Sequence, residues 1–172
     1  FLTLCEDDQG RIWAGTYSSG IYVIDGITNK ELAHYSTHEE NSPIKSDFVF
    51  DIFKDSSGDI WIGGMNTEVI CYRTKEHVFQ RYNVQPLTVF AELSPNEILM
   101  GCAYGLSVTQ KDTNKFDILL PHCVVKDILV RDDGVWICTS GDGLMRYDPK
   151  NGVSDIYTVD DGLPSNFINS IS

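Results

Sequence analysis

Short apolar runs alternate with polar turns along the whole chain, and the same order of runs and turns returns four times. Each copy opens on an apolar run, at residues 1–5, 48–53, 88–93 and 124–130. An Asp-, Ser- or Gly-rich turn, a run centred on Trp or Leu, a second reversal and two weaker runs then follow. No segment keeps helical periodicity over ten or more residues. The pattern therefore predicts four short β-strands per repeat and an all-β fold.

The turn that marks each repeat is clearest at residues 55–63, which read Asp-Ser-Ser-Gly-Asp-Ile-Trp-Ile-Gly. Related turns lie at residues 7–15 and 132–138, and a degenerate copy lies at 94–101. Gly can take positive φ, and Asp or Ser can bond its own backbone, so these residues suit a tight reversal. In the degenerate copy, Asn96 replaces the Gly, and because Asn tolerates left-handed turns nearly as well as any non-Gly residue, we expect the turn to survive.

The spacing of the repeats identifies the architecture. If Trp13, Trp61, Leu99 and Trp136 are equivalent, subtraction of their numbers gives separations of 48, 38 and 37 residues. A period near 40 is typical of β-propellers, in which four-stranded blades surround a central axis. An immunoglobulin-like sandwich is the structural alternative, but it would not explain why Gly-x-Ile-Trp returns.

The prediction is one β-propeller fragment over residues 1–172, with about four four-stranded blades that form part of a larger propeller. The blades are expected at residues 1–35, 48–86, 87–122 and 123–157, with the first strand of a next blade at 167–172. In the first blade, we expect a core face that holds Leu2, Leu4, Trp13, Ile21 and Val23. All three tryptophans are expected to be buried between blades. The open sheet faces should be covered by further blades, by another domain of the same chain or by a second copy in a homodimer.

The repeat resembles a known family at several places. Residues 6–16 followed by 20–25, and residues 136–139 followed by 142–149, resemble the two-component regulator propeller repeat. Residues 161–171 resemble that family's link between blades. The third repeat departs from the family because it lacks the Gly and the Trp, and the second lacks the double-Gly turn at residues 66–68.

The resemblance implies a function for the chain. Such repeats build the extracytoplasmic sensor half of membrane histidine kinases, often hybrid ones, that regulate polysaccharide use in gut Bacteroidetes. The implied role is a periplasmic, ligand-sensing segment of an inner-membrane protein, which responds to an oligosaccharide and signals to transcription. The segment itself would not be an enzyme, whereas the parent chain would be a protein histidine kinase.

Composition narrows the choice of partners. The 172 residues are 42% hydrophobic with a formal net charge of −12, which is enough apolar material for a core. Binding of nucleic acid needs a basic stripe, so an acidic chain with scattered Lys and Arg argues against it and against direct membrane contact. The apolar runs are too short to span a bilayer. Phe1 begins inside a predicted strand, and we expect the chain to be a piece of a longer protein.

The candidate ligand-binding surface combines loops that should open on one side of the blades. The long polar link Ser36–Asp47 accounts for the larger first separation, and in a four-stranded blade it shares a face with the loop between strands two and three. A solvated loop without a function is the simpler alternative for this link. The candidate ligand-binding residues on this face are Tyr17, Ser18, Asn66, Tyr104 and Asp142, together with the link.

Metal and cofactor sites are not predicted. His34 and His38 are four residues apart, but this spacing gathers ligands only on a helix, and Pro43 with its polar neighbours gives no sign of one. The acidic turns lack the ligand pattern of a calcium-binding EF-hand loop. Five cysteines without a Cys-x-x-Cys pair predict free thiols in strands.

Two other function classes stay open. The turn at residues 55–61 resembles the Asp-box of sialidases, so a glycoside-cleaving propeller is one alternative, although only five scattered arginines are present to grip a carboxylate. A scaffold whose acidic surface binds a protein is the other. No nucleophile, phosphate-loop or kinase motif occurs in the chain.

Overall fold

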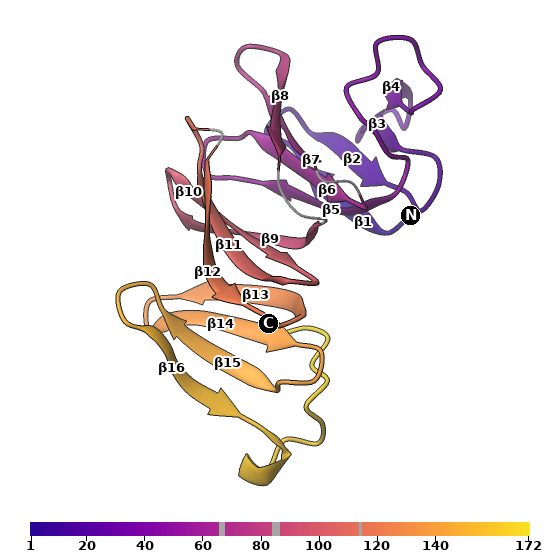
Figure 1. The fold of residues 1–172 in the computed structure, drawn as a ribbon. Helices are drawn as coiled ribbons and strands as arrows, with labels where there is room; N and C mark the ends of the chain where they lie inside the picture. The colour runs from indigo at the N-terminus through magenta and orange to yellow at the C-terminus, as the bar shows by residue number, and fades with distance from the viewer. Residues whose placement is uncertain (66–67, 84–86, 114) are drawn as a thin grey trace. The chain divides into compact units, whose positions relative to one another are not determined.

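The computed structural model describes residues 1–65, 68–83, 87–113 and 115–172, and these residues are almost entirely β. The strands form four antiparallel sheets of four, and within each sheet they follow one another in sequence order (Figure 1). Such sheets are the blades of a β-propeller, so the expected all-β fold class is confirmed. The chain divides into two compact units, residues 1–87 and 88–172, each with its own core.

Unit 1 contains the first two sheets. The first sheet consists of β1 (Thr3–Glu6), β2 (Arg11–Gly15), β3 (Ile21–Asp25) and β4 (Glu31–Tyr35), and the second of β5 (Val49–Lys54), β6 (Ile60–Gly64), β7 (Glu68–Arg73) and β8 (Val78–Asn83). Apolar side chains from both sheets form one buried cluster, which includes Trp13, Ile21, Val49, Ile62 and Ile70. Ile44, from the link between the sheets, joins this cluster and is 3% exposed. The link is therefore anchored by an apolar side chain.

Unit 2 repeats the arrangement. Its sheets consist of β9 (Leu87–Ser94), β10 (Glu97–Cys102), β11 (Gly105–Gln110) and β12 (Phe116–Pro121), and of β13 (Val125–Arg131), β14 (Gly134–Thr139), β15 (Leu144–Asp148) and β16 (Gly152–Tyr157). Leu99 takes the place of the tryptophan and is fully buried. Helix among the described residues is confined to the 3-10 turn η1 (Val159–Asp161), and no described helix has the length and apolar character needed to cross a bilayer.

The turn of the degenerate copy is present, as expected, although Asn96 is absent from the described residues with positive φ. Its hairpin has a two-residue turn, Pro95-Asn96, between β9 and β10. Proline at the first central position suits a turn type that needs no left-handed residue at the second. The Ser94 hydroxyl donates to Glu97 across the turn at 2.9 Å, which closes it further.

The last residues of the chain lie against the end of β14, in the same way as the start of β5 lies against the end of β2. Val49 N–H donates to the Thr16 carbonyl, and Ile168 N–H donates to the Thr139 carbonyl, both at 2.9 Å. Further along, Ile52 N–H donates to the Thr3 hydroxyl and Ile171 N–H to the Asp127 carboxylate. Residues 168–171 therefore occupy the place that an innermost strand takes in unit 1, although Phe167 forms only an isolated bridge with Ser140.

The burial of the first sheet corrects the predicted core face. Trp13, Ile21 and Val23 are buried, but Leu2 and Leu4 are 48% and 65% exposed. Successive side chains of a strand point to opposite faces. Leu4 pairs with Ala14 on β2, whereas Cys5 pairs with Trp13, so Leu4 lies on the sheet face that turns away from the unit 1 core.

The three tryptophans are not equivalent either. Trp13 and Trp61 are 1% and 0% exposed, but Trp136 is half-buried. Trp13 packs against Tyr72 of the neighbouring sheet, with ring centroids 5.1 Å apart, whereas Trp136 stacks on Tyr157 of its own sheet. Val135 and Ile137 face the unit 2 core, so Trp136 lies on the other face of the last sheet, on which no described sheet packs, and its burial between sheets stays a prediction.

Replacement of Gly20 by alanine is expected to lower the free energy of unfolding by about 2–3 kcal/mol, because both strain and overlap oppose it. Gly20 has φ +71°, and an added Cβ would overlap the Tyr35 carbonyl. Gly10 is a matched control, with φ +73° and open space around it, so Gly10→Ala should cost about 1 kcal/mol. Urea denaturation measures both variants, and equal losses would contradict the role of the overlap.

Candidate functional site

The loop between β2 and β3 has a conformation that its own side chains stabilise. The Thr16 hydroxyl donates to the Gly20 carbonyl at 2.9 Å and accepts from Ser19 N–H at 2.8 Å. The loop between β14 and β15 in unit 2 is built in the same way, since Thr139 donates to the Gly143 carbonyl and accepts from Asp142 N–H. The same two side-chain hydrogen bonds therefore close residues 17–19 and 140–142, although Gly141 takes positive φ and its counterpart Ser18 does not.

The link Ser36–Asp47 lies directly against the first of these loops. Gly20 N–H donates to the Asp47 carbonyl at 3.0 Å, and a His34 ring nitrogen lies 2.7 Å from the Ser19 carbonyl. Both ends of the link are tied together, because Thr37 donates its N–H and its hydroxyl to the Asp47 carboxylate. Burial raises the pKa of Asp47, but the hydrogen bonds from Thr37 outweigh it, and the net pKa is lowered. An ionised carboxylate thus holds the link beside the loop.

Tyr17 is the most exposed aromatic side chain of this surface. It is 64% exposed, and its ring packs edge-on against Phe48, with centroids 5.0 Å apart. Ser18 beside it is also exposed. The structure therefore brings Tyr17 and Ser18 together with the link, on one side of unit 1.

The other sequence-predicted residues lie elsewhere. Tyr104 is 64% exposed, and its carbonyl accepts from His122 N–H, while Asp142 is exposed on the loop whose Ser140 N–H donates to the Val124 carbonyl. Both loops therefore flank residues 122–124, within unit 2. Asn66 lies outside the described residues.

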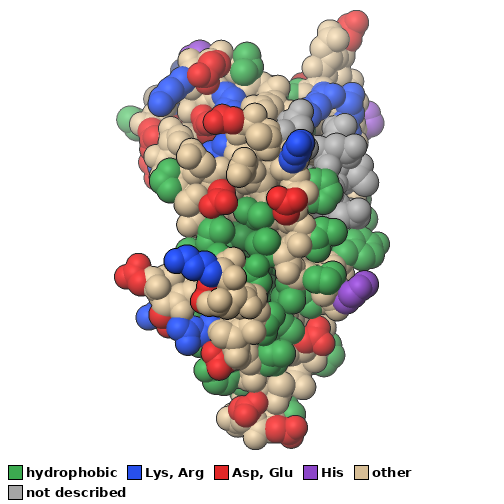
Figure 2. Space-filling view, turned by 60° about the vertical axis from the view of Figure 1, so that its left-hand side comes forward, with side chains coloured by type: hydrophobic (Ala, Val, Ile, Leu, Met, Phe, Trp, Pro, Cys, Tyr) green, Lys and Arg blue, Asp and Glu red, His purple; other side chains and the backbone are tan. Residues whose placement is uncertain are grey.

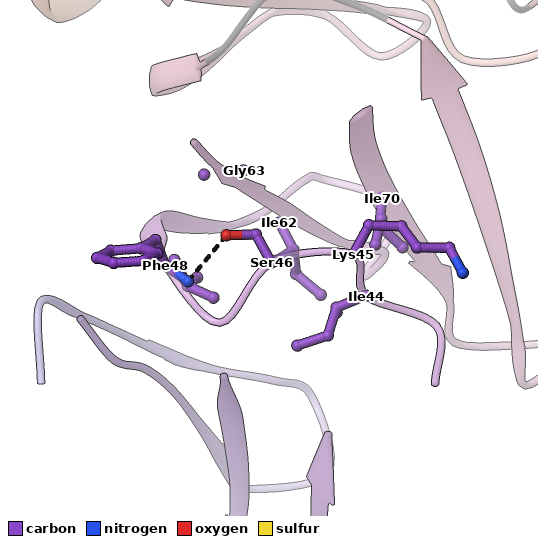
Figure 3. A pocket seen from close by; sticks show the side chains of 9 residues that line it. Ile44, Lys45, Ser46, Phe48, Ile62, Gly63 and Ile70 are labelled. Carbon is purple, nitrogen blue, oxygen red and sulfur yellow. Dashed lines mark hydrogen bonds between the residues drawn. The ribbon is translucent and has the colours of Figure 1, made fainter. Parts of the chain in front are cut away.

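A shallow depression adjoins Phe48 in unit 1 and was not predicted from the sequence. Its space for a water-sized sphere is about 20 Å³, and a volume of about 290 Å³ is reached only when the part open to solvent is included. Its wall combines the end of the link with β6 and β7: Ile44, Lys45, Ser46, Phe48, Val49, Ile62, Gly63, Gly64 and Ile70 (Figure 3). We name it the Lys45 depression, because Lys45 is the one charged residue in that lining. An isolated apolar residue near the end of a polar link, here Ile44, is the signal that could have pointed to it.

The acidic turns at the other end of the first two sheets are structural. Asp7 accepts hydrogen bonds from Gln9 N–H, Arg11 N–H and the Trp13 indole, and Asp55 accepts the equivalent bonds from Ser57 N–H, Asp59 N–H and the Trp61 indole. Both carboxylates are nearly fully buried, at 4% and 2% exposure. Burial raises the pKa of Asp7, but these hydrogen bonds outweigh it and lower the net value. These aspartates fold the hairpin and fasten the tryptophan.

Three arginines sit over the tryptophans and engage carboxylates. The guanidinium carbons of Arg11, Arg73 and Arg146 lie 5.8, 6.0 and 5.8 Å from the ring centroids of Trp13, Trp61 and Trp136. Arg11 pairs with Asp7 at 2.6 Å and Arg73 with Asp59 at 2.9 Å. Cation–π contacts and ion pairs thus hold these arginine side chains against their own sheets.

The remaining candidate reactive groups are buried thiols and dispersed acidic side chains. Burial raises the pKa of the Cys123 and Cys138 thiols to about 11, so both stay protonated at neutral pH. Within the described ranges, no group of three His, Cys, Asp or Glu side chains is arranged to hold a metal ion. Figure 2 shows acidic side chains dispersed over the visible face and mixed with Lys and Arg.

Comparison with known proteins supports the resemblance in the sequence. Residues 1–18 and 43–66 match the family model described as two component regulator propeller. No curated protein matches the sequence significantly. The two matched segments contain the first acidic turn with Trp13 and the second with Trp61.

Solved structures match nearly the whole chain. The extracellular domain of BT3049 from B. thetaiotaomicron, assigned as a hybrid two component system, is 26% identical with a TM-score of 0.81. The match covers 99% of this chain and 24% of that one. The extracellular domain of BT4673 from the same organism, also assigned as a hybrid two component system, is 14% identical with a TM-score of 0.83 and the same coverage, which shows the shared fold. This chain spans about a quarter of the length of these domains. Sequence match and structural likeness agree with the resemblance: residues 1–18 and 43–66 match the two component regulator propeller model, and nearly the whole chain shares the fold of these extracellular domains.

Proposed function

We propose that this chain is a non-catalytic, ligand-sensing segment in the extracytoplasmic region of a two-component sensor, and that the ligand is an oligosaccharide. The observation that carries the proposal is the match of 99% of the chain, at 26% identity, to an extracellular domain of such a system. The kinase would lie elsewhere in the parent polypeptide, with transcription as the output. Further blades of the parent chain, or a second copy of it, would cover the open sheet faces.

The surface formed by Tyr17, Ser18 and the link is the proposed capture site in unit 1. A tyrosine ring offers an apolar face with a polar hydroxyl, which suits the mixed apolar and hydroxyl surface of a sugar. The link is fastened at Ile44, at Asp47 and, through Arg81, at Ser42 and Pro43. Bound ligand biases the sensor only through a difference in affinity between its conformations.

The engaged arginines favour sensing over a sialidase-like reaction. A sialidase needs arginines to grip the carboxylate of its substrate, but Arg11 and Arg73 are already paired with Asp7 and Asp59. The Asp-box-like carboxylate, Asp55, is buried under three hydrogen bonds and does not face solvent. Both features favour a structural role for the Asp-box-like turn, as part of the hairpin, over a catalytic one.

The first experiment is calorimetric titration of the full-length protein with a panel of defined oligosaccharides, with product analysis of the same samples. Saturable binding without cleavage supports the sensor. Cleavage would assign the protein to the glycosidases instead. Absence of both binding and cleavage would favour a protein-binding scaffold.

Tyr17→Ala is expected to weaken binding of an oligosaccharide found in that titration by about tenfold, because it removes an exposed aromatic anchor. Ile27→Ala is the control, since Ile27 is 92% exposed in the turn at the other end of the same sheet. Alanine variants at Ser18, Asn66, Tyr104, Asp142 and along the link complete the series. Unchanged affinity across the whole series would reject this face.

A further inference from the structure

We propose that the Lys45 depression binds an anionic group, a carboxylate or a sulfate, on the captured sugar, so that the sensor prefers charged oligosaccharides. The inference rests on the proposed function and adds the class of ligand. The whole chain is acidic, with 25 acidic and 13 basic residues. The lining of the depression, in contrast, contains one basic residue, Lys45, and no acidic residue.

Lys45 supplies the charge of the depression. In Figure 3 its side chain extends beside Ile70, so the methylenes cover apolar surface while the ammonium stays in solvent. Within the described ranges, Lys45 forms no ion pair, and no acidic residue lines the depression. Its positive charge is therefore available to a ligand.

Arg81 adds a second positive charge on the same side of the sheet. Arg81 on β8 is the register partner of Ile70 on β7, and directly paired residues project to the same face. Its guanidinium donates to the carbonyls of Ser42 and Pro43 at 3.3 and 3.1 Å, which places it against the link close to Lys45. Carbonyl groups are neutral, so Arg81 keeps its net positive charge. Lys45 and Arg81 are therefore two cations on the Ile70 side of the depression.

Two of the three carboxylates of the link, those of Asp47 and Glu39, have partners other than Lys45. Asp47 accepts from Thr37, and Glu39 lies 3.8 Å from a His34 ring nitrogen. Glu40 is exposed. The depression thus pairs the nearly buried apolar walls of Ile44 and Ile62 and the ring of Phe48 with a cationic rim, so it suits a small anionic group while the sugar ring itself stays outside.

The test titrates the full-length protein with an oligogalacturonate and with the same oligomer after methyl esterification, which removes only the charge. A sulfated oligogalactan and its desulfated form are the second pair and separate sulfate from carboxylate recognition. We expect at least one charged form to bind about tenfold or more tighter than its neutral partner. We also expect this preference to shrink as NaCl is raised, because salt screens exposed charges.

Lys45→Gln should lower the affinity for the charged form about tenfold and leave the affinity for the neutral form unchanged. Lys45→Arg should retain the preference for the charged form. Lys75→Gln, the same charge change in the exposed turn after β7, should alter neither.

Equal binding of charged and neutral forms, or equal loss of both in Lys45→Gln, would overturn the anionic preference while leaving the sensor role standing. Failure of all four compounds to bind would also overturn it. The proposed function itself fails only if no oligosaccharide of the wider panel binds either.

Discussion

Replacement of Trp13 by alanine is expected to lower the free energy of unfolding by about 3–5 kcal/mol, the range for a large aromatic residue removed from a core. The Trp13 ring is 1% exposed, packs 5.1 Å from Tyr72 of the neighbouring sheet and stacks on Tyr35 at 6.4 Å. Its indole N–H is the donor to the buried Asp7 carboxylate at 2.8 Å. The substitution therefore opens a cavity between two sheets and removes a hydrogen bond to a buried charge. Urea denaturation followed by circular dichroism measures the loss.

In the chain of residues 1–172, Trp136→Ala is the matched control from the same place in another repeat, because no described sheet packs on the Trp136 ring there. Trp136 is half-buried, its nearest acceptor Asp133 lies 3.5 Å away, and its ring stacks on Tyr157 of its own sheet. Less apolar area leaves water on folding, so the expected loss is about 1–2 kcal/mol. A loss as large as that of Trp13→Ala would contradict the burial argument.

Asp55→Ala should lower the free energy of unfolding by about 3–4 kcal/mol, although its side chain is small. The carboxylate accepts from Ser57 N–H, Asp59 N–H and the Trp61 indole at 2.8, 3.1 and 2.8 Å, and it is 2% exposed. Alanine leaves three donors without this acceptor, and an unsatisfied buried donor costs about 1–3 kcal/mol. Urea denaturation again measures the effect. Asp55→Asn is a second variant that keeps the shape of the side chain while removing its charge.

Asp133→Ala tests the same acidic turn where it is exposed. Its side chain is 47% exposed and takes part in surface ion pairs with Arg131 and Arg146, which contribute little to stability. The expected loss is below about 0.5 kcal/mol. If Asp55→Ala and Asp133→Ala destabilise the protein equally, burial of the carboxylate is not what makes the turn important.

The candidate site could be predicted only in part. The length and polarity of Ser36–Asp47 singled out the link, and the reversal at residues 17–19 singled out the loop, because both features are local. Lys45 and Arg81 were missed, since neither stands in a motif. Arg81 reaches the link only through the fold, since its contact with Pro43 joins residues 38 positions apart.

The sequence alone determined the order and number of strands, because alternation with period two and turn chemistry act between residues close in the chain. It also determined the Asp-to-Trp hairpin, whose partners lie within six residues of one another. Only the tertiary structure decided which face of each sheet is covered. Leu4 and Trp13 are equally apolar in the pattern, yet one is 65% exposed and the other 1%, because burial depends on which neighbouring sheet packs against which face. The cationic depression arises for the same reason, since it exists only where the link folds back across β7 and β8.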